Sequence, residues 1–362
     1  MKLLVFKYNE PGWNLNYAQF AEQILLVGQN ASGKSKTIKA LAKVGALISQ
    51  KISISEYDGM NVLLAFETKD GGLMYTFTVN KGDVINEELE FTDFKTNEVT
   101  VVISRHQSSC ILMNELINPP SNKLVVNVRR DTQSYPLMEQ LQVWAENVLG
   151  FSFNETDMYG DSDNESWFYG YKNRLNDIVV DMENSEGAKE EFYAMLKEIN
   201  YNITEIKALD FASQKKVFVK EFGINRPLFD ISMSKGMFRA IFLVAYLLYF
   251  KRNKIGQPAM LLVDDLCEGL DYNRSTKLGK LCFNMCQQLG IQLMASSNDS
   301  FLMDVVDLKY WNILRRVGSK VEVINANKDP ELFEHFEMTG LTNFDLFSSD
   351  FITRYKANNE KK

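Results

Sequence analysis

The stretch Gly28-Gln29-Asn30-Ala31-Ser32-Gly33-Lys34-Ser35 decides how the surrounding chain folds, and it matches the phosphate-loop pattern GxxxxGK[ST] in full. Glycines let backbone N–H groups turn inward around a β-phosphate, and the positive N-terminal end of the next helix adds to the attraction. The motif follows the apolar run 23–27 and precedes a helical pattern over 33–49, which is the strand–loop–helix context that a working loop requires. The residues expected to contact a nucleotide here are Gly28, Asn30, Ala31, Ser32, Gly33, Lys34, Ser35 and Lys36.

Two acidic residues supply the second half of such a site. The apolar run Met260-Leu261-Leu262-Val263 ends in Asp264 and Asp265. Lys34 is expected to reach the β- and γ-phosphates of ATP, while the Ser35 hydroxyl and Asp264 hold Mg²⁺. Asp265 is placed to orient and deprotonate an attacking water. The two motifs together predict binding of ATP and Mg²⁺.

Strand and helix patterns alternate at both ends of the chain, which indicates an α/β fold whose mostly parallel core sheet carries helices on both faces. Between the two ends, alternating runs at 61–66, 73–79 and 99–104 predict an antiparallel β subdomain. The run 125–128 is expected to be a strand that returns to the main sheet. We therefore expect an N-terminal lobe over 1–135, a helical or irregular insert over 136–230, and a C-terminal lobe over 231–362.

Composition narrows the function classes. The net charge of −7 and a pI near 5.2 do not favour a protein that coats nucleic acid or an anionic membrane. The longest apolar run, 240–250, is much shorter than the roughly 20 residues of a membrane-spanning helix, so no membrane partner is expected. Four cysteines show neither a disulfide framework nor paired metal-ligand spacing. These features predict a cytoplasmic protein.

Two further stretches resemble the ABC class of ATPases. Asp265-Leu266-Cys267-Glu268-Gly269-Leu270-Asp271 resembles the segment from the catalytic acid to the D-loop, and Met233-Ser234-Lys235-Gly236-Met237-Phe238-Arg239 resembles the ABC signature. The resemblance implies that Asp271 is the D-loop aspartate. It also implies that Ser234 and Gly236, at the start of a helix, reach the γ-phosphate of ATP held by a second copy. The partner is then the chain itself, in an ATP-dependent head-to-tail homodimer.

Three residues take less typical places in this scheme. Asn298 stands where the class usually has a histidine switch, and an amide can bond phosphate but cannot titrate. Gln133 is the candidate for the glutamine loop, with Gln107 as the other choice. Glu268 is the alternative catalytic base should Asp265 not serve. Because Asp265 replaces the usual glutamate and Asn298 the usual histidine, we expect slow hydrolysis and a long-lived ATP-bound dimer.

Asn30 and Ser32 make the phosphate loop resemble that of the RecF, SMC-type and OLD-type branch. The interval 37–231 lacks the heptads of an SMC arm, and too few residues follow Asp304 for an OLD-type nuclease domain. The chain therefore looks like the ATPase subunits of bacterial anti-phage defence systems, which control a separate effector protein.

Other functions stay open at this point. A DNA-associated repair or maintenance ATPase of the RecF/SMC type could use a stripe built from the pairs 129–130, 215–216 and 315–316, although such pairs are more often a solvated face. A transporter subunit would need a membrane partner, and a small-molecule kinase leaves the signature and D-loop unexplained. The aromatic segment 336–347 either covers the core or docks a partner.

Overall fold

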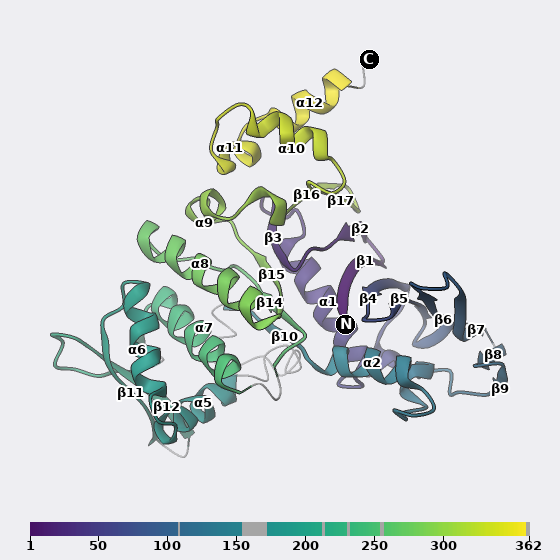
Figure 1. Cartoon of the computed structure of the whole chain (residues 1–362), viewed down its shortest axis with the longest axis horizontal. Helices are drawn as coiled ribbons and strands as arrows, with labels where there is room; N and C mark the ends of the chain where they lie inside the picture. The colour runs from purple at the N-terminus through teal and green to yellow at the C-terminus, as the bar shows by residue number, and fades with distance from the viewer. Residues whose placement is uncertain (108, 154–171, 212–213, 230–231, 254–256, 360–362) are drawn as a thin grey trace.

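A computed structural model describes residues 1–107, 109–153, 172–211, 214–229, 232–253 and 257–359. Fourteen of the strands that it describes form one large sheet (Figure 1). Their order across the sheet is β10 (Val148–Phe151), β14 (Met260–Val263), β15 (Gln292–Ser296), β3 (Gln23–Val27), β16 (Trp311–Val317), β17 (Lys320–Ile324), β2 (Trp13–Gln19), β1 (Lys2–Glu10), β4 (Met60–Glu67), β5 (Gly71–Asn80), β6 (Asp83–Asp93), β7 (Val99–His106), β8 (Ser109–Leu112) and β9 (Glu115–Ile117).

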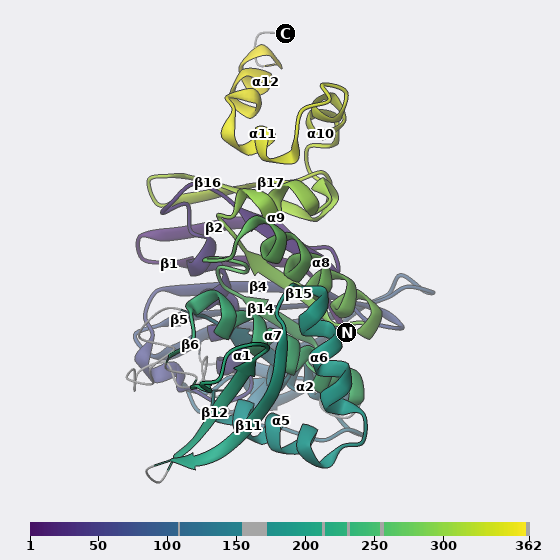
Figure 2. The same ribbon diagram turned by 90° about the vertical axis from the view of Figure 1, so that its left-hand side faces the viewer.

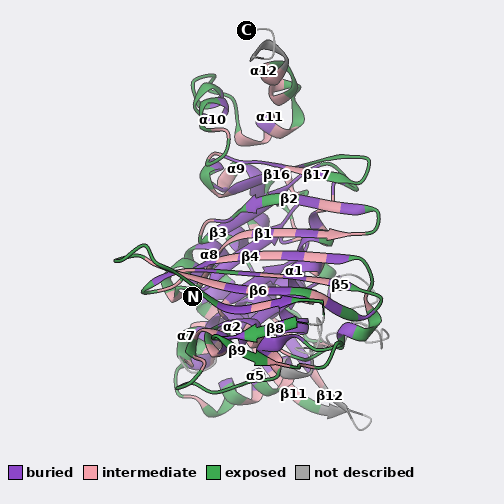
Figure 3. Cartoon of the chain, turned by 90° about the vertical axis from the view of Figure 1, so that its right-hand side faces the viewer, coloured by how far each residue is buried: buried purple, intermediate pink, exposed green. Residues whose placement is uncertain are grey.

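The sheet has a parallel part and an antiparallel part. Strands β10, β14, β15, β3 and β16 run parallel to one another, whereas the strands from β2 to β9 pair antiparallel. Figure 3 shows the antiparallel strands with buried and less buried residues in alternation, as for β4 and β5. Strands β10, β14, β15 and β3 are instead buried along their whole length, because helices cover both faces.

Helices flank the parallel strands on both sides. On one face lie α1 (Lys34–Ile48) and α2 (Pro136–Glu146), and on the other lie α7 (Lys235–Arg252) and α8 (Tyr272–Leu289). Alternate residues of a strand serve the two cores. In β14, Leu261 and Val263 pack with α7 and α8, while Met260 and Leu262 pack with α1 and α2.

The remaining described elements extend this core at two ends. Helices α5 (Lys172–Asn184) and α6 (Ala188–Glu198) pack against α7. A second sheet consists of β11 (Ile203–Phe211), β12 (Gln214–Glu221) and β13 (Leu228–Phe229). The hairpin of β11 and β12 projects from the body in Figure 2. Beyond β15 the chain forms α9 (Ser300–Val305), α10 (Pro330–Glu337), α11 (Asn343–Ser348) and α12 (Phe351–Asn359). Short 3₁₀ turns are η1 (Ile54–Glu56), η2 (Val125–Asn127) and η5 (Leu308–Tyr310).

The predicted mostly parallel sheet with helices on both faces and the antiparallel β subdomain are confirmed. The strand predicted at 125–128 is wrong, because these residues form the 3₁₀ turn η2. The backbone N–H groups of Val125 and Val126 donate to the buried carboxylate of Glu87 rather than to a neighbouring strand. The helical or irregular insert expected over 136–230 also contains strands, since β10 joins the main sheet and β11–β13 form the second one.

The aromatic C-terminal segment packs onto its own chain. Phe336 and Leu346 are buried in the core that α7 and α8 share, and Phe344 and Phe347 pack against that core. Met338 is by contrast 83% exposed. Among the helices that the structure describes, none is long and apolar enough to cross a membrane.

Candidate nucleotide site

The phosphate loop joins the end of β3 to the start of α1, as the sequence predicts. Two residues of the loop have positive φ, Ala31 at 64° and Gly33 at 106°, so the chain reverses direction tightly before the helix begins. A Cβ on Gly33 would lie 3.2 Å from the indole nitrogen of Trp13, and one on Gly28 would lie 2.8 Å from the carbonyl oxygen of Leu314. The packing of the loop therefore requires a glycine at position 28, and the positive φ of the turn requires one at position 33.

Lys34 lies folded back into this loop. Its Nζ donates to the carbonyl oxygens of Gly28 at 2.6 Å and Gln29 at 3.3 Å. Burial lowers the pKa of Lys34, and the charges of Asp265 and Asp264 oppose that shift. The ammonium is thus held by the loop carbonyls within range of the charges of the two acids, which is where the negative oxygens of a bound triphosphate need a cation.

Asp264 and Asp265 lie at the end of β14, beside the neighbouring strand β15. Ser296, the last residue of β15 and fully buried, connects them: its Oγ donates to Asp264 Oδ1 at 2.5 Å and accepts from the backbone N–H of Asp265 at 2.9 Å. Burial, followed by the charges of Asp264 and Glu268, raises the pKa of Asp265 to about 6. Ser296 was missed in the sequence analysis, although a polar residue closing the apolar run 291–295 was a usable signal.

The donor set fits a nucleotide with Mg²⁺. Asp264 is 1% exposed, and its Oδ2 has no hydrogen-bond partner among the described residues. The buried Oγ of Ser32 also lacks a partner within the part of the chain that the structure describes. A buried carboxylate oxygen left unpaired is costly unless a ligand completes it. Carboxylate and hydroxyl oxygens with coordinated phosphate are the ligands that Mg²⁺ prefers.

The side chains of Asn298 and Asn30 contact each other beside the phosphate loop. Asn298 Nδ2 donates to Asn30 Oδ1 at 3.4 Å, which joins the segment after β15 to the phosphate loop. Lys36 points away from this contact and pairs with Glu10 on β1, with 2.7 Å between Nζ and Oε1. Asn298 therefore lies beside the loop, whereas the Lys36 side chain pairs with Glu10.

The signature-like segment starts α7. Ser234 is the exposed N-cap residue, and its Oγ accepts the backbone N–H of Met237 at 3.2 Å. Gly236 is buried: a Cβ there would lie 2.7 Å from the carbonyl oxygen of Gly269 and 2.7 Å from Leu270. The sequence analysis expected Gly236 to permit close approach of a γ-phosphate, but within this chain the close neighbour is the segment after Asp265.

Asp271 and Glu268 lie in that same segment. Asp271 is the N-cap of α8, where its Oδ1 accepts the backbone N–H of Arg274 at 3.1 Å. Glu268 is exposed, and its carboxylate lies 3.5 Å from the guanidinium of Arg239. Within this chain Asp271 thus caps the start of α8.

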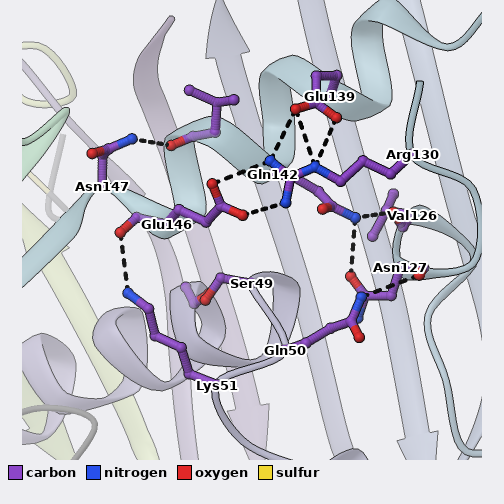
Figure 4. A network of polar contacts seen from close by, with 12 residues as sticks. Ser49, Gln50, Lys51, Val126, Asn127, Arg130, Glu139, Gln142, Glu146 and Asn147 are labelled. Atoms are coloured by element: carbon purple, nitrogen blue, oxygen red, sulfur yellow. Dashed lines mark hydrogen bonds and ion pairs between the residues drawn. The ribbon is translucent and has the colours of Figure 1, made fainter. Parts of the chain in front are cut away.

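Gln133 requires a correction, because the strand expected to deliver it to the site is the turn η2. The segment that leads to Gln133 is anchored beside the C-terminal end of α1 (Figure 4), whereas the phosphate loop precedes the N-terminal end of that helix. There Gln50 donates to the carbonyl oxygen of Asn127, and Arg130 pairs with two glutamates of α2. Gln107, the other choice, lies in the turn between β7 and β8.

The strand that does run into the site from the middle of the chain is β10. It pairs parallel with β14, and its Phe151 carbonyl accepts the backbone N–H of Asp264 at 2.8 Å. Ser152 and Phe153 follow directly and are buried beside the acids. The apolar run 148–151 after a helical pattern could have indicated this strand.

Comparisons with known proteins agree with this arrangement at the level of the fold. No protein-family model and no curated protein match the chain. The solved structure of an Smc head bound to the C-terminal winged-helix domain of ScpA has a TM-score of 0.55 at 13% identity, covering 91% of this chain and 99% of that one. A Pyrococcus furiosus Smc head with an extended coiled coil, bound to the C-terminal domain of ScpA, gives a TM-score of 0.51 at 12% identity over 93% and 99%. The chain therefore has the fold of an SMC head domain.

Proposed function

We propose that this protein binds ATP with Mg²⁺, hydrolyses it slowly and dimerises head to tail around it. The observation that carries the proposal is the meeting of two separate motifs. Lys34 of the phosphate loop lies close enough to Asp264 and Asp265, at the end of β14, for their charges to act on its pKa, and the buried Oδ2 of Asp264 has no hydrogen-bond partner among the described residues. The ABC-class fold supports the same conclusion.

Each residue has a defined task in this proposal. Lys34 turns from the carbonyls of Gly28 and Gln29 toward the β- and γ-phosphates, and the Ser35 hydroxyl and Asp264 hold Mg²⁺, which neutralises phosphate charge. Ser296 fixes the orientation of Asp264 and the backbone of Asp265. Asp265 accepts the proton of the attacking water.

Two substitutions relative to the class support slow turnover. The carboxylate of Asp265 reaches about 1.5 Å less far than that of a glutamate would. Asn298 cannot titrate, and in this chain its amide is engaged with Asn30. We infer a switch that stays in the ATP-bound state rather than a motor.

A protein partner follows from the same proposal. The two Smc heads used in the comparison are described as bound to ScpA domains. We propose that this chain likewise controls a separate effector protein, in an anti-phage defence system. The longest helices that the structure describes, α7 and α8, have 18 residues each, so the described chain contains no SMC-like coiled-coil arm.

Nucleotide binding and turnover test the proposal with two variants. Lys34→Ala removes the phosphate ligand, so calorimetry should show a sharp loss of Mg-ATP affinity. Asp265→Asn should bind ATP normally but release no phosphate. Unchanged affinity in Lys34→Ala would contradict the site, and wild-type turnover above about 10 per second, near the median for enzymes, would contradict the switch. Steeply salt-dependent binding to DNA would instead favour the RecF/SMC-type alternative.

A further inference from the structure

Arg239 is a buried cation that the proposed chemistry does not use. It lies in the second turn of α7, five residues after Ser234, and is only 2% exposed. Arginine is seldom buried to this extent without a partner. Its surroundings therefore indicate a specific task.

The guanidinium of Arg239 connects three segments of the site. It donates to the backbone carbonyl of Glu268 and lies 3.5 Å from the Glu268 carboxylate. Its central carbon lies 5.0 Å from the centroid of the Phe153 ring, at the end of β10. Gly236 also packs closely against Gly269. We call this contact region, between the start of α7 and residues 265–270, the joint.

That segment needs external support because its backbone is strained. Asp265 and Cys267 have φ of 53° and 71°, a left-handed conformation that costs energy for residues with a side chain. Two backbone hydrogen bonds hold the segment locally. The N–H of Leu266 donates to the carbonyl oxygen of Ser296, and the N–H of Glu268 donates to that of Asp265. A charge-assisted hydrogen bond from Arg239 to the carbonyl oxygen of Glu268 also anchors the segment to α7.

We propose that Arg239 is a positioning residue for hydrolysis, which holds residues 265–269 so that the Asp265 carboxylate stays aimed at the attacking water. The inference rests on the proposed ATPase function and deepens it. Arg239 acts through the backbone of Glu268 and touches neither ATP nor Mg²⁺. The exposed Glu268 carboxylate then serves the ion pair with Arg239 and is not the catalytic base.

Hydrogen exchange in the nucleotide-free protein tests the joint without any ATPase activity. Removing a charge-assisted bond in Arg239→Gln should speed exchange of the amides over 265–270 by about 10- to 100-fold, while amides in the second half of α7 keep the wild-type rate. Arg239→Lys, which retains a donor, should show a smaller increase. Wild-type exchange over 265–270 in Arg239→Gln would overturn the inference, as would equal loosening of α7 throughout.

Kinetics separate positioning from binding. Arg239→Gln should lower kcat by about 10- to 100-fold, as small misplacements of catalytic groups do, with the ATP dissociation constant unchanged; Arg239→Lys should recover part of kcat. Arg252→Gln is the matched control, because Arg252 lies at the other end of α7 and pairs with Glu191 at the surface.

Glu268→Gln should keep most of kcat, and its complete inactivity would make Glu268 the base and overturn the assignment. Absence of ATP binding in the wild-type protein would remove the proposed function but leave the exchange result to stand.

Discussion

Two buried carboxylates show how single residues set the chemistry of this fold. Asp264 has one oxygen bonded to Ser296 and the other without a described partner, which suits a metal ligand. Glu87 on β6 is instead fully satisfied: it accepts from Tyr75 on β5 and from the amides of Val125 and Val126, and Arg105 on β7 lies 4.0 Å away. Its role is to fasten η2 to the antiparallel strands.

Glu87 should make the stability of the protein depend on pH. Burial raises its pKa from 4.5 to about 7, against the hydrogen bonds and the Arg105 charge that lower it. Between these two values the folded state holds a proton that the unfolded chain has lost. The free energy of unfolding should therefore fall as pH rises from 4.5 to 7, by at most about 1.4 kcal/mol per pH unit from this group.

Glu87→Gln cannot titrate and is the control for this effect. Urea unfolding of both proteins at pH 5, 6, 7 and 8 should show the wild-type stability, relative to the variant, decreasing up to pH 7 and constant above it. A difference that stays constant from pH 5 to 8 would contradict the assignment.

At the scale of elements, the sequence identified those whose patterns arise locally. Strands β3, β14 and β15 are mostly apolar runs that end at Gly28, Asp264 and Ser296, and α1 follows the loop directly. The run 125–128 has the β-branched residues of a strand but becomes a turn because a distant carboxylate takes its amides. Strand β6 was missed because its many acidic residues hide the alternation of buried positions. Whether these two segments form a turn or a strand depends on tertiary contacts, which the intrinsic strand propensity of their residues does not reflect.

The joint between α7 and the segment after Asp265 yields a prediction at this scale. Gly236→Ala places a Cβ 2.7 Å from the backbone carbonyl oxygen of Gly269, so one of the two segments must move. We expect a loss of about 1–3 kcal/mol in the free energy of unfolding, typical of overpacking.

Gly72→Ala is the matched control, because the nearest atom to its Cβ lies at 3.8 Å and its φ is not positive. Chemical denaturation of both variants compares the two sites directly. Equal stability of Gly236→Ala and Gly72→Ala would show that the joint is not tightly packed.

At the scale of the whole molecule, the site is assembled from both ends of the chain. The phosphate loop comes from near the start of the chain, and the acids and Ser296 come from its C-terminal third, yet β3, β14 and β15 are neighbours in one sheet. Gln292 on β15 adds a second link between these distant segments by bonding both backbone groups of Leu3 on β1. The sequence predicted this union from motif order alone. The place of β10 and the packing of α10–α12 could not be predicted, because both depend on which surface of the core a distant segment covers.

The proposed head-to-tail dimer places the exposed N-terminus of α7 against a second copy of the chain. Ser234 lies at the surface, and the proposal requires it to reach ATP held by the phosphate loop of that second copy. Sedimentation velocity of Asp265→Asn, which should hold ATP without consuming it, measures this directly. We predict that Asp265→Asn is monomeric without nucleotide and dimeric with Mg-ATP. When Ser234→Arg is added to it, the protein should still bind ATP but stay monomeric under both conditions. A protein that stays monomeric while saturated with Mg-ATP, or a Ser234→Arg variant that dimerises normally, would contradict the account.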